Sequence, residues 1–359
     1  MRVALLAPLF ERVPPRYYGG TERVVYNLCR GLSAAQVDYT LYASADSLCQ
    51  GRLVAVVDEP LRLRSLPLGD PIASHFKMLA QVAREAEQYD VIHNHHDYWM
   101  LPLTQMSSVP LVSTLHGRLD LPEIRAALLG YPKGVYISIS DAQRGPLPEL
   151  PWLKTVYHGL VAEDFQFYPR PGEYLAFLGR ISPEKRPEWA IEIARRSGVP
   201  LKIAAKIEGE WGRSYYDTWV KPHVDGRFIE YVGEISEQQK AEFLGKALAT
   251  VFPIDWPEPF GLVMVESLAC GTPVLARPCG SVPEILKEGV TGFLDLDVSK
   301  LAARVSEVGT LDRAACRQWV EQRFSLQRMT EDYLHVYRHV VAQKPRGQRP
   351  FREVWPGWS

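Results

Sequence analysis

Two glutamates, Glu258 and Glu266, flank the start of an apolar helical pattern and are the side chains best placed to do chemistry. Glu258 lies among two prolines and a glycine, which are poor helix formers, so we expect it in a turn. Residues 262–269 read as a buried helix that closes at Gly271. Eight helical residues rise about 12 Å, so the two carboxylates are too far apart to share one proton or one metal ion.

The helix that begins between these glutamates offers a site for an anion. The first N–H groups of a helix have no partner within it and attract negative charge. Here they belong to Phe260, Gly261, Leu262 and Val263. A carboxylate, an anion site and a second carboxylate suit a ligand with hydroxyls at both ends and phosphates in the middle. A nucleotide sugar has this layout.

The elements that must position these groups alternate between strands and helices in both halves of the chain. Expected strands cover residues 3–7, 39–43, 91–93, 109–114 and 134–139, then 174–178, 200–204, 229–232, 249–252 and 274–276. Expected helices cover residues 22–33, 74–88, 187–197, 236–246, 262–269 and 283–288. This alternation predicts an α/β protein with two doubly wound, Rossmann-like domains that face a central cleft.

We expect the domains to cover residues 1–165 and 166–325, with a linker near residues 159–171. Residues 326–341 form a strong amphipathic helix pattern. The tail beyond it keeps Trp355 and Trp358, so we expect it to dock partly on the protein.

The overall composition excludes several classes of protein. The 359 residues are 46% hydrophobic and 23% charged with a net charge of −1, so we expect no nucleic-acid partner. No apolar run reaches the roughly 20 residues of a membrane span, and the N-terminus does not fit a signal peptide. Five scattered cysteines fit free thiols in a reducing cytoplasm.

Other chemistry is expected at the carboxyl ends of strands, where sheets of this class bind ligands. Gly20 follows Gly19 at a helix start, which fits either a simple turn or close approach to a ligand. His116 stands where a strand gives way to a loop, either as a buried structural histidine or as a functional one. Arg180 and Lys185 share one loop, and a guanidinium with an ammonium suits a diphosphate.

Two patterns that suggest metal binding are better explained without a metal. His93, His95 and His96 belong to a strand end, where alternation separates His96 from the other two side chains. Asp295 and Asp297 form a D-x-D pattern, which we expect to be a surface turn.

These residues together resemble the retaining glycosyltransferases of family GT4, which have the GT-B architecture. The resemblance covers nearly the whole chain. The segments that carry it are Glu258 with Glu266, Gly179-Arg180 with Glu184-Lys185, Cys270 to Val274, Gly280 to Glu284 and Gly289 to Leu294.

The resemblance implies a role for each site residue. Glu258 would contact the transferred sugar, Glu266 the ribose, and Arg180 with Lys185 the diphosphate. The backbone of residues 260–262 would take the sugar hydroxyls and the distal phosphate, and Glu234 would lie against the base. Gly20 would close over the phosphates and His116 would stand beside the reacting sugar. The last helix and the tail, about residues 326–359, would cross back to the first domain.

The expected activity is therefore transfer of a hexose from a UDP- or GDP-linked donor to an acceptor hydroxyl, with retention and without a metal or cofactor. The acceptor stays open among sugars, small molecules and lipid-linked molecules. Alternatives are a nucleotide-sugar epimerase, another enzyme of the same fold, or a non-catalytic nucleotide-sugar binding protein.

Overall fold

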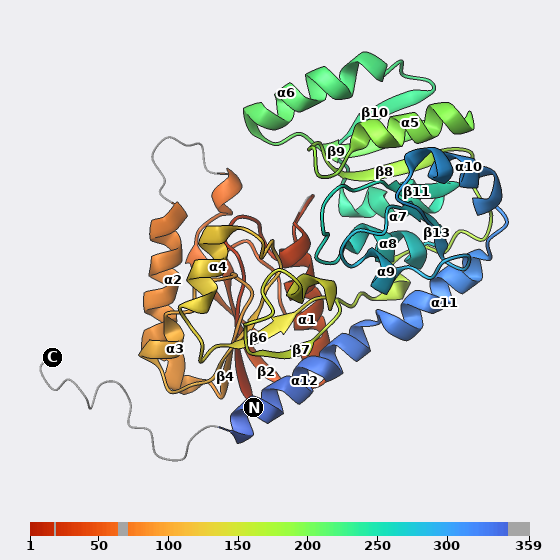
Figure 1. Cartoon of the computed structure of the whole chain (residues 1–359). Coiled ribbons are helices and arrows are strands. Elements are labelled where there is room, and N and C mark those ends of the chain that lie inside the picture. Colours follow the sequence, from red (N-terminus) through yellow and green to blue (C-terminus); the bar gives the residue numbers. More distant parts are fainter. Residues whose placement is uncertain (18, 64–70, 344–359) are drawn as a thin grey trace, which may run out of the picture. The chain divides into compact units, whose positions relative to one another are not determined.

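The computed structural model divides the chain into two compact units (Figure 1). It describes residues 1–17, 19–63 and 71–343. The first unit contains residues 1–159 together with the chain from Leu326 onward, whereas the second runs from Leu160 to Ser325. Residues 160–165, which we expected in the first domain, therefore belong to the second unit. Trp355 and Trp358 lie outside the described residues.

The first unit is built on a parallel sheet that has, within the described residues, seven strands in the order β3-β2-β1-β4-β5-β6-β7. The strands are β1 (Arg2–Leu6), β2 (Asp38–Ser44), β3 (Arg52–Val57), β4 (Val91–Asn94), β5 (Leu111–Thr114), β6 (Val135–Ser138) and β7 (Trp152–Thr155). In the central strand β1, Val3 pairs with Tyr39 of β2 on one side and Val91 of β4 on the other. Its continuous apolar run is buried because both faces of the sheet are covered.

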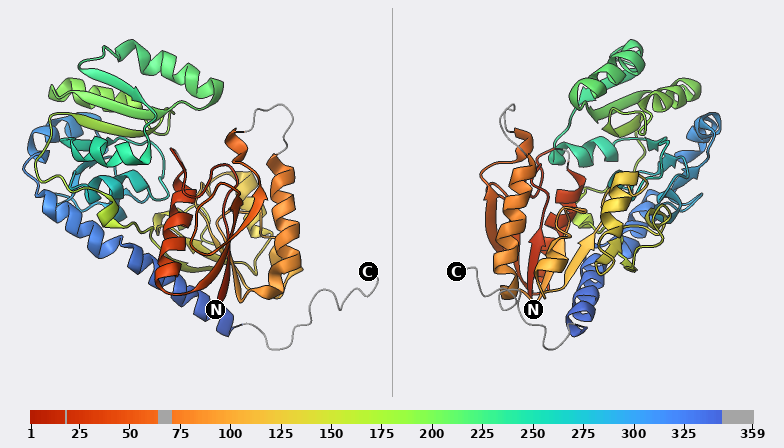
Figure 2. Two further views of the ribbon diagram at one scale, coloured as in Figure 1. Left: turned by 180° about the vertical axis from the view of Figure 1, so that it is seen from behind. Right: turned by 60° about the vertical axis from the view of Figure 1, so that its left-hand side comes forward.

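Helices cover both faces of this sheet. They are α1 (Gly20–Ala34), α2 (Pro71–Glu85), α3 (Leu103–Met106), α4 (Pro122–Leu129) and α12 (Leu326–Ala342). Ile92 of β4 belongs to a buried cluster with Met78 of α2 and Leu128 of α4. The next side chain, His93, points to the opposite face and contacts Tyr337 of α12. On that face α1 and α12 lie side by side (Figure 2).

The second unit repeats this architecture with a parallel sheet of six strands within the described residues, in the order β10-β9-β8-β11-β12-β13. The strands are β8 (Leu175–Arg180), β9 (Leu201–Lys206), β10 (Ile229–Gly233), β11 (Ala249–Phe252), β12 (Val274–Ala276) and β13 (Gly292–Leu294). The helices are α5 (Pro187–Ser197), α6 (Gly209–Trp219), α7 (Glu237–Gly245), α8 (Leu262–Ala269), α9 (Val282–Ile285), α10 (Val298–Val308) and α11 (Arg313–Arg323).

Both sheets reverse their strand order at one internal point, between β1 and β4 in the first unit and between β8 and β11 in the second. This is the order of a doubly wound Rossmann-like sheet, in which ligands bind outside the carboxyl ends of the strands at the reversal. The predicted α/β class with two doubly wound domains is confirmed. The structure adds edge strands β3, β7 and β13, and it shortens the helix expected over residues 283–288 to four residues.

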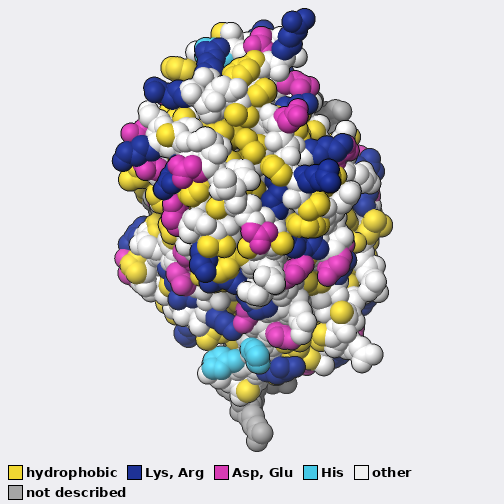
Figure 3. All heavy atoms as spheres, turned by 90° about the vertical axis from the view of Figure 1, so that its right-hand side faces the viewer, with side chains coloured by type: hydrophobic (Ala, Val, Ile, Leu, Met, Phe, Trp, Pro, Cys, Tyr) yellow, Lys and Arg dark blue, Asp and Glu magenta, His cyan; other side chains and the backbone are white. Residues whose placement is uncertain are grey.

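No helix within the described ranges is long and apolar enough to cross a membrane. The face shown in Figure 3 carries lysine and arginine side chains interspersed with aspartate and glutamate, without a large area of one sign.

Candidate functional site

Two loops of the second unit leave neighbouring strands at the point where the strand order reverses. Residues 181–186 follow β8, and residues 253–261 follow β11. The first loop carries Lys185 and begins just after Arg180, the last residue of β8, while the second carries Glu258. Because both loops leave the same edge of the sheet, side chains that are far apart in sequence can meet there.

Lys185 and Glu258 do meet, as an ion pair. Glu258 is only 9% exposed, and its Oε2 also accepts a hydrogen bond of 2.8 Å from the indole Nε1 of Trp256. The Lys185 ammonium lies 5.2 Å from the ring centroid of Trp256 and 5.5 Å from that of Phe252. A cation, a carboxylate and two aromatic rings thus form one compact group at the end of β11.

The Glu258 loop is held by the segment that precedes α9. The N–H of Ser281 donates to the Glu258 carbonyl at 2.9 Å, and its hydroxyl donates to the Phe260 carbonyl at 2.8 Å. Gly280 has a φ of +61°, and a Cβ there would lie 2.4 Å from the Glu258 backbone nitrogen. Only glycine permits both this conformation and this close approach.

The N-terminus of α8 lies directly after this loop. Gly261 is its N-cap residue with a φ of +81°, and the N–H of Met264 donates to the Gly261 carbonyl at 3.0 Å. The N–H groups of Leu262 and Val263 precede that first donor and so have no acceptor within the helix. Phe260 is buried beneath the turn, with its ring edge-on to Phe324. The structure thus begins α8 at Leu262, and the binding of an anion at this helix start stays a prediction.

Glu266 lies within α8, four positions after its first residue Leu262, and has a different partner. Its side chain is almost completely buried in α8, and its Oε1 lies 2.7 Å from the Nζ of Lys240 in α7. Lys240 also pairs with Glu237 at 3.0 Å. Glu258 and Glu266 thus each form an ion pair with a lysine of their own.

Arg180 is held by acidic side chains of two loops. Its guanidinium lies 3.3 Å from Glu184 and 3.5 Å from Glu208, which follows β9. Glu208 also pairs with Lys206 at 3.1 Å. Glu234 is exposed at the end of the edge strand β10. Arg180 and Glu234 thus stand at the carboxyl ends of their strands, as the sequence suggested, but neither belongs to the Lys185–Glu258 group.

The D-x-D pattern forms a local turn. Asp297 is the N-cap of α10 and accepts a hydrogen bond of 2.8 Å from the N–H of Ser299, while Asp295 accepts one from the N–H of Asp297. The predicted surface turn is confirmed. Among the described residues, no group of three or more His, Cys, Asp or Glu side chains is arranged to hold a metal ion.

In the first unit, Gly20 begins α1 and Gly19 is its N-cap residue, with a φ of +156°. A Cβ on Gly19 would lie 2.7 Å from that of Pro15, so this turn requires glycine. Glu22 is buried in the first turn of α1, and this burial raises its pKa to about 7.

His116 follows β5 and belongs to a group of histidines on the same side of the sheet. Its Nε2 lies 2.9 Å from the Nδ1 of His95, and its ring stacks on that of His158. Burial lowers the pKa of His116 to about 3, and it lowers the pKa of His95 well below 6.5. Both rings are therefore neutral at pH 7, and only one of them can donate a proton to the bond between them.

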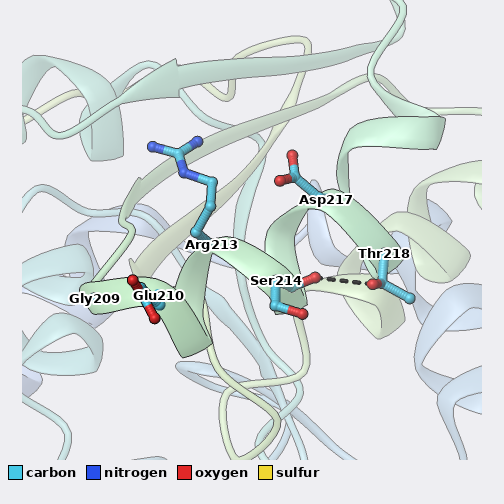
Figure 4. Close-up of a pocket in the computed structure, with 6 residues that line it drawn as sticks. All are labelled: Gly209, Glu210, Arg213, Ser214, Asp217 and Thr218. Atoms are coloured by element: carbon cyan, nitrogen blue, oxygen red, sulfur yellow. Dashed lines mark hydrogen bonds between the residues drawn. The ribbon is translucent and has the colours of Figure 1, made fainter.

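A shallow depression of about 650 Å³ runs along α6, lined by Gly209, Glu210, Arg213, Ser214, Asp217 and Thr218 (Figure 4). None of the predicted site residues lines it. The Thr218 hydroxyl donates to the Ser214 carbonyl within the same helix, as expected for a solvent-facing surface.

Among the residues of the second unit that sequence reasoning missed, Trp256 contacts Glu258 and Lys240 contacts Glu266. Trp256 stands two positions before Glu258 in a loop after a buried strand, which is a usable signal for a site residue. Lys240 carries no such signal, because its contact with Glu266 depends on the packing of α7 against α8.

Two family models match consecutive parts of the chain. The model of Glycosyltransferase Family 4 matches residues 18–159, and that of Glycosyl transferases group 1 matches residues 163–322. The D-inositol 3-phosphate glycosyltransferase of Frankia alni is 28% identical, with 77% of this chain and 82% of that protein covered.

Solved structures resemble the chain over nearly its whole length. Sucrose-phosphate synthase from Thermosynechococcus elongatus has a TM-score of 0.79 at 18% identity, with 96% of this chain and 100% of that chain covered. Anabaena HepE in complex with UDP-glucose has a TM-score of 0.73 at 18% identity, with 94% and 100% covered. At these identities the likeness shows the fold.

Proposed function

The chain belongs to the GT4 glycosyltransferases, which have the GT-B fold, and on this premise we propose that it transfers a hexose from a nucleoside diphosphate sugar to an acceptor hydroxyl with retention of configuration. The observation that carries the proposal is the Lys185–Glu258 pair beside the N-terminus of α8. It puts a carboxylate for sugar hydroxyls next to a cation and backbone N–H groups for phosphate.

In this proposal the donor lies along the carboxyl edge of the second sheet. Glu258 accepts hydrogen bonds from the sugar, and Glu266 accepts them from the ribose. The N–H groups of the α8 N-terminus, with Arg180 and Lys185, bind the diphosphate. Arg180 would exchange Glu184 and Glu208 for phosphate oxygens. The base would lie against the backbone near Glu234.

The reaction would proceed by attack on the same face from which the diphosphate leaves. The bond between the anomeric carbon and the diphosphate oxygen breaks, and its electron pair goes to that oxygen. The acceptor oxygen bonds to the anomeric carbon, and its proton passes to the departing diphosphate. Arg180, Lys185 and the α8 N–H groups stabilise the negative charge that develops, so the proposal requires no metal ion. Activity in EDTA should equal activity with added Mg²⁺.

The donor can be identified by incubating the protein with UDP-glucose, GDP-mannose and ADP-glucose and measuring release of the nucleoside diphosphate. Acceptors to test include D-inositol 3-phosphate, because a relative's name specifies it. Release that rises with acceptor and gives a product with the donor's anomeric configuration would support the proposal. Interconversion of the donor sugar without release would indicate an epimerase, and inversion would overturn the proposed stereochemistry.

Glu258→Gln and Arg180→Ala should each lower turnover by two or more orders of magnitude, because each removes charge that contacts the donor. Arg196→Ala is a matched control, since among the described residues Arg196 pairs only with Glu192 on the exposed face of α5. Full activity in both site variants would refute the assignment of this site.

A further inference from the structure

We propose that Trp256 is a positioning residue of this site, which fixes the Glu258 carboxylate through its indole N–H and seats the Lys185 ammonium on its ring. This inference rests on the proposed function, because it assigns Glu258 to the sugar and Lys185 to the diphosphate.

The two oxygens of Glu258 have different surroundings. Oε2 accepts from both the Nε1 of Trp256, at 2.8 Å, and the Nζ of Lys185. Oε1 makes no hydrogen bond to any described residue, but it is not fully buried. The protein thus holds one oxygen and leaves the other partly exposed, where a sugar hydroxyl can donate to it.

Trp256 is itself held at both ends of a short loop. On one side, the N–H of Asp255 donates to the Glu184 carbonyl at 2.9 Å, and its carboxylate pairs with Arg186 at 2.5 Å and with Arg277 at 2.6 Å. On the other side, Ser281 holds the Glu258 carbonyl. The indole is therefore placed by fixed backbone rather than by the ligand.

This arrangement has a consequence when a diphosphate binds. Phosphate oxygens compete with Glu258 for the Lys185 ammonium, so the ion pair weakens as the donor arrives. The indole N–H carries no charge, so a bound phosphate attracts it less than it attracts the Lys185 ammonium. It keeps Oε2 in place, so Oε1 stays aligned with the sugar while Lys185 turns to the diphosphate.

Two substitutions separate the roles of the indole. Trp256→Phe keeps an aromatic face for Lys185 but removes the N–H donor, whereas Trp256→Leu removes both. Hydrogen bonds to charged groups are strong enough that Trp256→Phe should lower kcat roughly 10- to 100-fold. The donor for this test is the nucleotide sugar from the panel above that the wild-type chain hydrolyses. The KM of Trp256→Phe for that donor should change less than about threefold, and so should its Kd for the matching nucleoside diphosphate. Trp256→Leu should also weaken nucleoside diphosphate binding. Trp219→Phe is the control, since Trp219 is 52% exposed on α6.

A double-variant cycle tests whether Trp256 acts through Glu258. Adding Trp256→Phe to Glu258→Gln should change kcat less than about threefold, because the charged acceptor is already gone. If Glu258→Gln is inactive but Trp256→Phe has wild-type kcat, the inference about Trp256 fails while the proposed function stands. If Glu258→Gln is fully active, the proposed function itself fails.

A second measurement does not depend on turnover. The indole N–H resonance of Trp256, identified by its loss in Trp256→Phe, should lie downfield of that of Trp219 and move upfield in Glu258→Gln. A resonance that is unchanged in Glu258→Gln would show that the indole is not bonded to this carboxylate and would overturn the inference. A Trp256→Phe variant that loses its folded spectrum would show a structural role and would overturn it too.

Discussion

Lys240 and Glu266 form an ion pair between α7 and α8, with Nζ 2.7 Å from Oε1 and both side chains largely excluded from water. An ion in such a place is tolerable only with its partner, because burial of an unpaired charge costs several kcal/mol. The pair therefore compensates for the burial of the Glu266 carboxylate inside the second unit, where the proposed contact with a ribose would be made.

Lys240→Met should lower the free energy of unfolding by about 3 kcal/mol, because it removes the Lys240 cation from the buried Glu266 carboxylate. Urea denaturation would measure the loss. Lys221→Met is the matched control: Lys221, which follows α6, pairs with Asp217 of that helix at an exposed site, where the expected loss is below about 1 kcal/mol. Adding Glu266→Gln to Lys240→Met should restore part of the stability, and no restoration would argue against the pair.

Gly280→Ala should abolish activity in a folded protein, because the added Cβ would lie 2.4 Å from the Glu258 backbone and push that loop out of place. Gly289→Ala is the matched control. Gly289 has a φ of +70°, close to the +61° of Gly280, but no atom lies within 4 Å of its added Cβ. Both variants carry the strain of a positive φ, roughly 1 kcal/mol, so equal activity in the two would contradict the role of close packing.

His95→Phe should lower turnover about five- to tenfold through His116, because it removes the bond that selects one neutral tautomer of that ring. His116→Ala should lower turnover further, and adding His95→Phe to it should have little effect. His96→Phe serves as control, since its ring contacts His75 and Trp99 instead. Additive losses in the double variant would mean that His95 acts independently of His116.

The stability of the protein should fall as the pH drops below about 6.5. Burial holds the pKa of a set of first-unit histidines well below the value of an unfolded chain, and these are His93, His95, His116 and His158. Between pH 6.5 and about 3 the unfolded state binds protons that the native state does not, so the free energy of unfolding decreases with falling pH.

Each such histidine contributes a slope that rises to about 1.4 kcal/mol per pH unit as the pH falls below 6.5. Glu22 acts in the opposite direction between pH 4.5 and 7, since its raised pKa lets the native state hold a proton that the unfolded state lacks. The histidines outnumber it, so urea midpoints should decrease from pH 6.5 to pH 5.5. A constant midpoint would mean that these rings are protonated in the native protein.

The sequence predicted the central strands because these are buried on both faces and read as continuous apolar runs. It missed β7, Trp152–Thr155, because that edge strand is only partly buried and reads like a loop. It missed α6 because Gly209 and Gly212 weaken the helical pattern of that segment.

The start of α8 was predictable from local pattern, because the prolines and the glycine before Leu262 keep Glu258 in a turn and leave Glu266 inside the helix. The candidate site was not predictable where contacts join separate elements. The pairing of Lys185 with Glu258 depends on β8 lying next to β11, and the bond from Trp256 depends on the course of the loop. No local pattern reports either relationship.

The second unit is inserted into the first, since the chain leaves the first unit at Gly159 and returns to it at Leu326. During synthesis on the ribosome, the sheet of the first unit therefore emerges long before α12, which supplies Tyr333 and Tyr337 to the face around His93. Residues 160–325 form a continuous stretch and can fold before α12 has been synthesised. During that time the face of the first sheet around His93 lacks its last helix. The nascent first unit then depends on completion of the whole chain, and a truncated product would expose a surface rich in histidine and apolar side chains.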